Sequence, residues 1–147
     1  LDGQEVTMPM RQPDVTNQVS TVAAQGTVRA DLTERQRKIA EAGGIVMDGR
    51  DIGTSVLPKA EVKIFLVASV EERAQRRFKD NAEKGIHTPM DVLRDEIQTR
   101  DHKDSTRAIS PLTQAADAVR LDTTSLSIDE VVDQISAIIT KKQQEFT

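Results

Sequence analysis

Two carboxylates and a guanidinium stand together in Asp48-Gly49-Arg50-Asp51, directly after the apolar run Ile45–Met47. Such a run is typical of a strand that is buried on both faces of a parallel sheet, and ligands bind at the carboxyl ends of these strands. An Arg beside an Asp supplies hydrogen-bond donors and acceptors together, which suits a phosphorylated ligand with a polar ring. The alternative is a turn with an internal Asp–Arg pair, because Asp-Gly is a common turn dipeptide.

A second basic group follows the strongest strand signal, Val62–Val67. Arg73, Arg76 and Arg77 are spaced to share one face of the next helix. Basic residues in the first turns of a helix oppose its dipole, which favours anions at that end. They therefore indicate either a phosphate site or a solvated face paired with neighbouring acids.

A third charged group closes a later helix, where Arg100, Asp104 and Arg107 are spaced four and three residues apart. If the helix continues, they present a donor, an acceptor and a donor on one face. The alternative is a set of surface ion pairs, each contributing about 0–1 kcal/mol.

Composition limits the possible functions. The 147 residues can form one ordinary core, and the net charge of −4 argues against a general polyanion binder. Aromatic residues make up only 2%, which argues against stacking of single-stranded nucleic acid. There is no Cys, and His87 and His102 lie far apart, so we expect no metal site. No apolar run approaches the roughly 20 residues of a membrane span.

The sequence pattern also predicts the strands and helices that would position these charged residues. We expect short strands over 45–47, 62–67 and 118–121, separated by helices, which predicts crossover connections and a mostly parallel α/β sheet. We expect helices from about 14, over 27–42 with Val28, Leu32 and Ile39 on one face, over 69–84, over 89–101 and from 127 onward. Capping boxes start two of them, Ser69 with Glu72 and Ser127 with Glu130, and Thr88 is the expected cap of the helix at 89.

Several longer runs resemble bacterial cytidylate kinases, in order and over nearly the whole chain. They are Val15–Ala24, Thr27–Arg37, Asp48–Thr54, Lys63–Arg77, Glu96–Asp101, Asp104–Leu112 and Ala116–Thr124. The resemblance implies a P-loop nucleoside monophosphate kinase fold, with a parallel sheet flanked by helices. It covers the C-terminal two-thirds of the family. The family's opening strand and phosphate-binding glycine loop would lie upstream of Leu1, so we expect an incomplete fold.

The resemblance also implies a division of the chain. Residues 1–42 are expected to be the remainder of the monophosphate-binding region. Residues 43–147 are expected to be the C-terminal part of the core α/β domain, with a lid at about 73–87. No G-x-x-x-x-G-K-S/T motif occurs in the sequence, so we expect this chain alone to lack kinase activity.

The resemblance assigns substrate-binding roles to seven residues. Asp51 accepts from the cytosine amine, while Arg29 and Arg107 donate to the acceptor edge of the base. Arg50 is matched to the phosphate. The residues matched to the pentose hydroxyls are Ser20, Arg100 and Asp104.

The remaining roles concern phosphoryl transfer. Arg76 and Arg77 lie in the lid and, with Arg107, are expected to neutralise transition-state charge. The last loop, Thr123-Thr124-Ser125, is expected to border the adenine of ATP.

The function that the resemblance implies is transfer of the γ-phosphoryl group of Mg-ATP to CMP or dCMP. The expected partners are these nucleotides, with no nucleic acid polymer and no membrane. The full-length enzyme is expected to be a cytoplasmic monomer that uses ATP and Mg²⁺ as cofactors. Two alternatives stay open: a nucleotide-binding module without catalysis, and a monophosphate kinase with another base preference.

Overall fold

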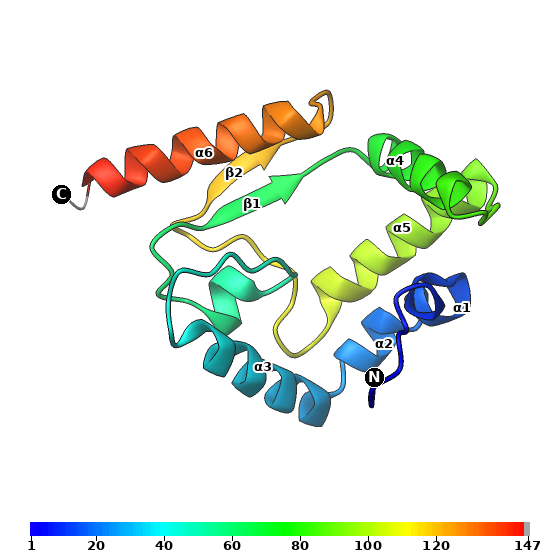
Figure 1. Cartoon of the computed structure of the whole chain (residues 1–147), viewed down its shortest axis with the longest axis horizontal. Helices are drawn as coiled ribbons and strands as arrows, with labels where there is room; N and C mark the ends of the chain where they lie inside the picture. Colours follow the sequence, from blue (N-terminus) through cyan, green and yellow to red (C-terminus); the bar gives the residue numbers. More distant parts are fainter. Residues whose placement is uncertain (146–147) are drawn as a thin grey trace.

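The computed structural model, which describes residues 1–145, contains a two-stranded parallel sheet (Figure 1). Strand β1 (Ile64–Val67) pairs with β2 (Val119–Asp122), in a register that sets Ile64 opposite Val119. Parallel neighbours need a long crossover, and here two helices supply it. The expected parallel α/β arrangement is confirmed for these two strands.

The crossover consists of α4 (Val70–Glu83) and α5 (Met90–Thr106), which pack against each other. Their shared core is Ala74, Leu93 and Ile97. Ser69 caps α4 as expected, since its Oγ accepts from the Glu72 amide at 3.1 Å.

The expected start and end of α5 are wrong. Pro89 takes the N-cap position in place of Thr88, and the helix continues past Asp101 to Thr106. Nothing in the 102–106 stretch interrupts helical hydrogen bonding, and Arg107 is the first extended residue. This extension carries Asp104 into a buried position.

The last helix, α6 (Ile128–Glu145), runs alongside β2 in Figure 1. Its predicted capping box is confirmed: the Ser127 amide donates to Glu130 Oε2 at 2.8 Å, and the Glu130 amide donates to Ser127 Oγ. Val131 and Ile135 on its predicted inner face are half-buried, whereas Ile128 is exposed.

The N-terminal part is helical but less regular than expected. It comprises the 3₁₀ turn η1 (Pro9–Arg11), α1 (Pro13–Thr16), α2 (Val19–Ala23) and α3 (Gly26–Ala40). The single helix expected from 14 is therefore wrong, because it is divided at 17–18. Its valines, Val15, Val19 and Val22, stay exposed, so no packed face holds the two short helices in line.

The predicted face of α3 is also wrong. Leu32 and Ile39 are exposed, while Arg29 is buried. The helix turns this polar side inward because Arg29 finds a carboxylate partner there.

The predicted strand over Ile45–Met47 is not formed. Neither β1 nor β2 pairs with this run, and Val46 is 94% exposed. A strand needs a neighbouring backbone for its hydrogen bonds, and no described segment supplies one here. The helix expected to run to 42 ends at Ala40 with Glu41 as its C-cap, and Gly43 and Gly44, both at positive φ, follow two residues later. Among residues 1–145, no helix has the length and apolar character needed to cross a bilayer.

Candidate functional site

Asp51 is the buried centre of the site, with 6% of its surface exposed. Its backbone carbonyl accepts from the Ser55 amide at 2.8 Å and begins the π-helical turn η2 (Ile52–Val56). Its Oδ2 is ion-paired with Arg29 Nη2 from α3. Arg29 is held in place by a second bond, from Nη1 to the Ala23 carbonyl at 3.2 Å.

Asp104 is the second buried carboxylate, with 2% exposure, on the last turn of α5. Arg50 Nε donates to its Oδ2 at 3.0 Å, and Arg100 Nε lies 3.8 Å from the same atom. Its backbone carbonyl accepts from the Leu112 amide at 2.7 Å. The residues beside Asp51 and those at the end of α5 are thereby brought together.

Arg107 joins the two carboxylates. Its Nη2 lies 3.8 Å from Asp51 Oδ1, and its Nη1 lies 3.8 Å from Asp104 Oδ1. Nε donates to the Ser110 carbonyl at 2.7 Å, which fixes the guanidinium plane. We call the whole group the arginine–aspartate cluster; its members are Arg29, Arg50, Asp51, Arg100, Asp104 and Arg107.

The cluster has more positive than negative charge, since four guanidinium groups face two carboxylates. Burial, and then the charge of Arg29, lowers the pKa of Arg107. Burial and the charge of Arg50 likewise lower the pKa of Arg100. Three buried donors of the cluster have no hydrogen-bond partner among the described residues: Arg29 Nε, Arg100 Nε and Arg107 Nη2. Unused donors and surplus positive charge suit an anionic ligand that also carries polar acceptors.

Ser20 is buried on α2, a helix that packs against α5. Of the residues matched to the substrate, the structure therefore unites six in the cluster and places Ser20 on a neighbouring element.

Arg76 lies apart from the cluster and holds the loop after β2. Its guanidinium donates to Thr123 Oγ1 at 3.2 Å, to the Thr123 carbonyl at 2.5 Å and to the Leu126 carbonyl at 3.3 Å. Glu72 pairs with it from the preceding turn of α4.

The three residues matched to adenine differ in their side-chain hydrogen bonds within the protein. The Thr123 hydroxyl donates to the Val67 carbonyl at 3.2 Å, and the Thr124 hydroxyl donates to Asp122 Oδ1 at 2.6 Å. Ser125 is exposed. The threonine side chains thus stabilise the loop, as do the amides of Thr123 and Thr124, which donate to the Val67 carbonyl and to Asp122 Oδ1.

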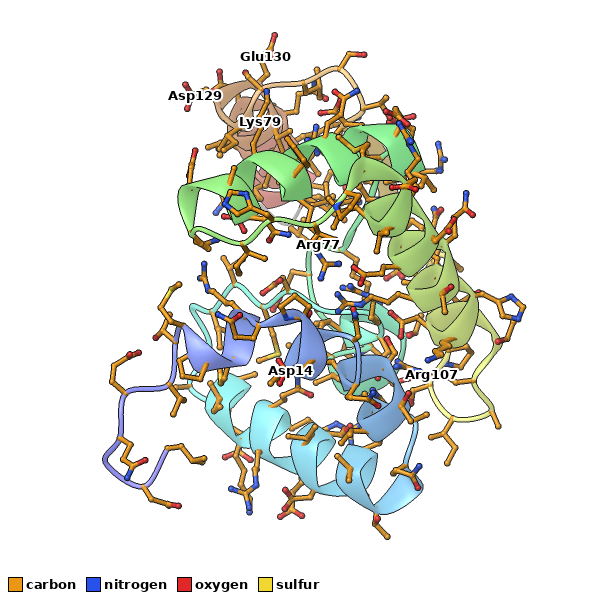
Figure 2. All side chains as sticks on the ribbon, turned by 90° about the vertical axis from the view of Figure 1, so that its right-hand side faces the viewer. Asp14, Arg77, Lys79, Arg107, Asp129 and Glu130 are labelled. Carbon is orange, nitrogen blue, oxygen red and sulfur yellow. The ribbon has the colours of Figure 1, made fainter. Side chains whose placement is uncertain are left out.

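Arg77 points from α4 toward the N-terminal helices, whereas Arg107 lies at the far end of α5 (Figure 2). Arg77 Nη2 donates to Thr16 Oγ1 at 3.2 Å. Its charge still reaches Arg100, whose pKa it helps to lower. The three arginines matched to catalysis therefore occupy three different surroundings.

Within residues 1–145, no group of three or more acidic or His side chains is placed to hold a metal ion. Asp51 and Asp104, the two buried carboxylates, are each paired with arginines. The described residues therefore do not fit a Mg²⁺ site.

Arg37 is a functional candidate that the sequence reasoning missed. It donates from Nε to the Val56 carbonyl at 2.9 Å and from Nη2 to the Ser55 carbonyl at 2.6 Å, so it ties η2 to α3. It also lines a pocket of about 640 Å³ that reaches Arg29 and Ile109. Arg37 lies eight residues after Arg29, about 80° around the helix, so the spacing alone does not indicate that the two side chains line one pocket.

Comparison with known proteins identifies the family to which the chain is similar. A family model described as cytidylate kinase matches residues 1–141. The cytidylate kinase of Lactiplantibacillus plantarum is 66% identical over 140 residues, which are 95% of this chain and 61% of that protein. Those of Ligilactobacillus salivarius and Enterococcus faecalis are 65% and 63% identical, each over 97% of this chain and 63% of the relative.

The chain thus spans a little over three fifths of the length of these curated relatives. Because the family model covers almost all of the 147 residues, the chain belongs to the cytidylate kinase family.

Proposed function

We propose that this chain carries the CMP-binding part of a nucleoside monophosphate kinase with a P-loop fold. The whole protein would transfer the γ-phosphoryl group of ATP to CMP or dCMP, giving CDP or dCDP. The observation that carries the proposal is the arginine–aspartate cluster, in which a buried carboxylate is flanked by arginine donors.

Asp51 selects the base. Its Oδ2 is paired with Arg29, whereas Oδ1 has no hydrogen bond within the described residues and lies 3.8 Å from Arg107. The exocyclic amine of cytosine donates to a carboxylate, and Arg29 and Arg107 donate to the ring acceptors beside it. Uracil has a carbonyl oxygen where cytosine has the amine, so uracil would set two acceptors against each other.

The rest of the cluster holds the remainder of the nucleotide. Arg50 supplies positive charge for the monophosphate, and Arg100, Asp104 and Ser20 hold the pentose hydroxyls. Arg107 donates to the base and also neutralises transition-state charge; its guanidinium lies 3.8 Å from both Asp51 and Asp104.

Arg76 and Arg77 belong to the proposed lid at 73–87 and neutralise charge as the phosphoryl group moves. Such a reaction proceeds by positioning and charge neutralisation, without a covalent enzyme intermediate. Residues 123–125 would border the adenine of ATP, and Mg²⁺ would assist the phosphates. The described residues do not themselves form a Mg²⁺ site.

The proposal is tested by calorimetric titration of this chain with CMP, dCMP and UMP, before and after Asp51→Ala. Losing a buried acceptor costs about 1–3 kcal/mol or more, and about 1.4 kcal/mol is one decade in affinity. The preference for CMP over UMP should therefore fall at least about tenfold in Asp51→Ala.

Asp31→Ala is the control, since Asp31 is an exposed acid that pairs with Arg35 on α3. Its CMP preference should be unchanged. Equal losses for CMP and UMP in a folded Asp51→Ala chain would show that Asp51 only holds the turn. Formation of ADP from ATP and CMP by the whole protein then tests the transfer itself.

A further inference from the structure

A second cationic pocket lies away from the arginine–aspartate cluster, between α4 and the N-terminal segment. Asp80 and Asn81 lie three and four residues after Arg77 on α4, and Lys84, the C-cap of α4, lies four residues after Asp80, so these side chains share one face. That face meets η1 and α1, and Figure 2 shows Arg77 directed toward these helices. The resulting pocket has a volume of about 310 Å³; its lining residues are Arg11, Thr16, Arg77, Asp80, Asn81 and Lys84.

The pocket has a surplus of positive charge, with three cations around one carboxylate. Lys84 is paired with Asp80 across one helical turn. That hydrogen bond, followed by the charges of Lys84, Arg11 and Arg77, lowers the pKa of Asp80. The whole protein is acidic, with a net charge of −4, so this local excess is opposite in sign to the average.

Several donors in the pocket are free. The Arg11 guanidinium and the Asn81 amide have no side-chain hydrogen bond to any residue in the 1–145 range. Arg77 makes a single bond there, to the Thr16 hydroxyl at 3.2 Å. Charged donors that converge on a recess are the usual means of holding a phosphate group.

We propose that this pocket binds a phosphate group through Arg11, Arg77 and Lys84, with Asn81 as a neutral donor. Its volume is at the small end of ligand sites, so it takes one phosphate-sized group rather than a whole nucleotide. Asp80 opposes binding and sets how strongly an anion is held. Arg77 also belongs to the proposed lid, whereas Arg11, Asp80 and Lys84 have no part in the proposed function, so variants at these three residues test the pocket by itself.

The test is a titration with inorganic phosphate at low ionic strength, followed by amide NMR shifts of this chain. Shifts should gather at residues 11–16 and 77–84. Removing one cation, in Arg11→Gln or Lys84→Gln, should weaken phosphate binding about three- to tenfold, which is the size of one partly screened charge contact. Asp80→Asn should tighten binding by a similar factor, a change that misfolding does not produce.

Lys79→Gln is the matched control, because it removes the same charge from the opposite face of α4 (Figure 2). It should leave phosphate affinity nearly unchanged. The proposal is overturned if Lys79→Gln weakens binding as much as Lys84→Gln, or if shifts are absent from residues 11–16 and 77–84.

Two further titrations separate the sources of phosphate and the two sites. Tighter binding of ATP with the same dependence on Arg11 would identify the phosphates of a nucleotide as the ligand, and binding of inorganic phosphate alone would identify the free ion. CMP affinity should be the same in Arg11→Gln as in the unchanged chain. Loss of the pocket's phosphate binding by Asp51→Ala in a folded chain would overturn the separation of the sites.

Discussion

At the scale of single residues, Arg29 shows why the buried charges must be considered as pairs. Its side chain points from α3 into the interior and forms an ion pair with Asp51, so both partners are largely buried. A buried ion pair is weak evidence for net stability, because desolvation offsets the attraction. Removing one partner is different, since it leaves the other charge buried and poorly compensated.

We therefore expect Arg29→Ala to lower the free energy of unfolding by about 3 kcal/mol, the lower end of the range for a broken buried pair, because Arg107 still lies near Asp51. Arg35→Ala on the same helix breaks an exposed pair with Asp31 and should cost only about 0–1 kcal/mol. Urea unfolding of the two variants measures the difference. Equal losses would mean that the Arg29–Asp51 pair is effectively solvated.

At the scale of elements, the α4–α5 pair is the best packed part of the described chain. Leu93 is 1% exposed and packs with Ala74 and Ile97 in one hydrophobic cluster. Ion pairs at the surface also connect α4 with α5; in one of them Arg73 donates two hydrogen bonds to the Asp101 carboxylate. This pair supports both the end of the cluster at Asp104 and the face of α4 that carries Arg77.

Leu93→Ala should accordingly destabilise the chain by about 2–5 kcal/mol, through lost burial and the cavity left behind. Val92→Ala, one position along α5 and 40% exposed, removes apolar atoms from the surface and should stay within about 0.5 kcal/mol. Thermal and urea unfolding compare the two. A Leu93 variant no less stable than the Val92 variant would contradict the assigned core.

At the scale of the whole molecule, apolar side chains face solvent over the N-terminal half. Val46 is 94% exposed, Ile39 64%, Val22 52% and Leu32 45%. Apolar surface of this kind promotes association or marks a place where other protein packs.

We expect this chain by itself to bind an apolar fluorescent dye and to associate as its concentration rises. The double change Ile39→Ser with Val46→Ser should reduce both effects and leave CMP affinity unchanged, because neither residue belongs to the cluster. Light scattering coupled to gel filtration reports the mass. A monodisperse monomer without dye binding would contradict this expectation.

What the sequence determined by itself was mainly local. The capping boxes at Ser69 and Ser127 were readable because a cap involves groups only three residues apart. The strand at β1 was readable from its own apolar, β-branched composition. Motif order along the chain was enough to identify the family.

The tertiary structure decided the rest, because partners distant in sequence set the outcome. Ile45–Met47 has strand composition but no neighbouring backbone to pair with, so composition could not make it a strand. The polar side of α3 faces inward because Asp51, 22 residues away from Arg29, offers an ion pair there. Adjacent arginines on one helix, Arg76 and Arg77, point to different partners because successive helical residues lie about 100° apart. The sequence supplies the charged residues, but tertiary packing determines which of them form ion pairs.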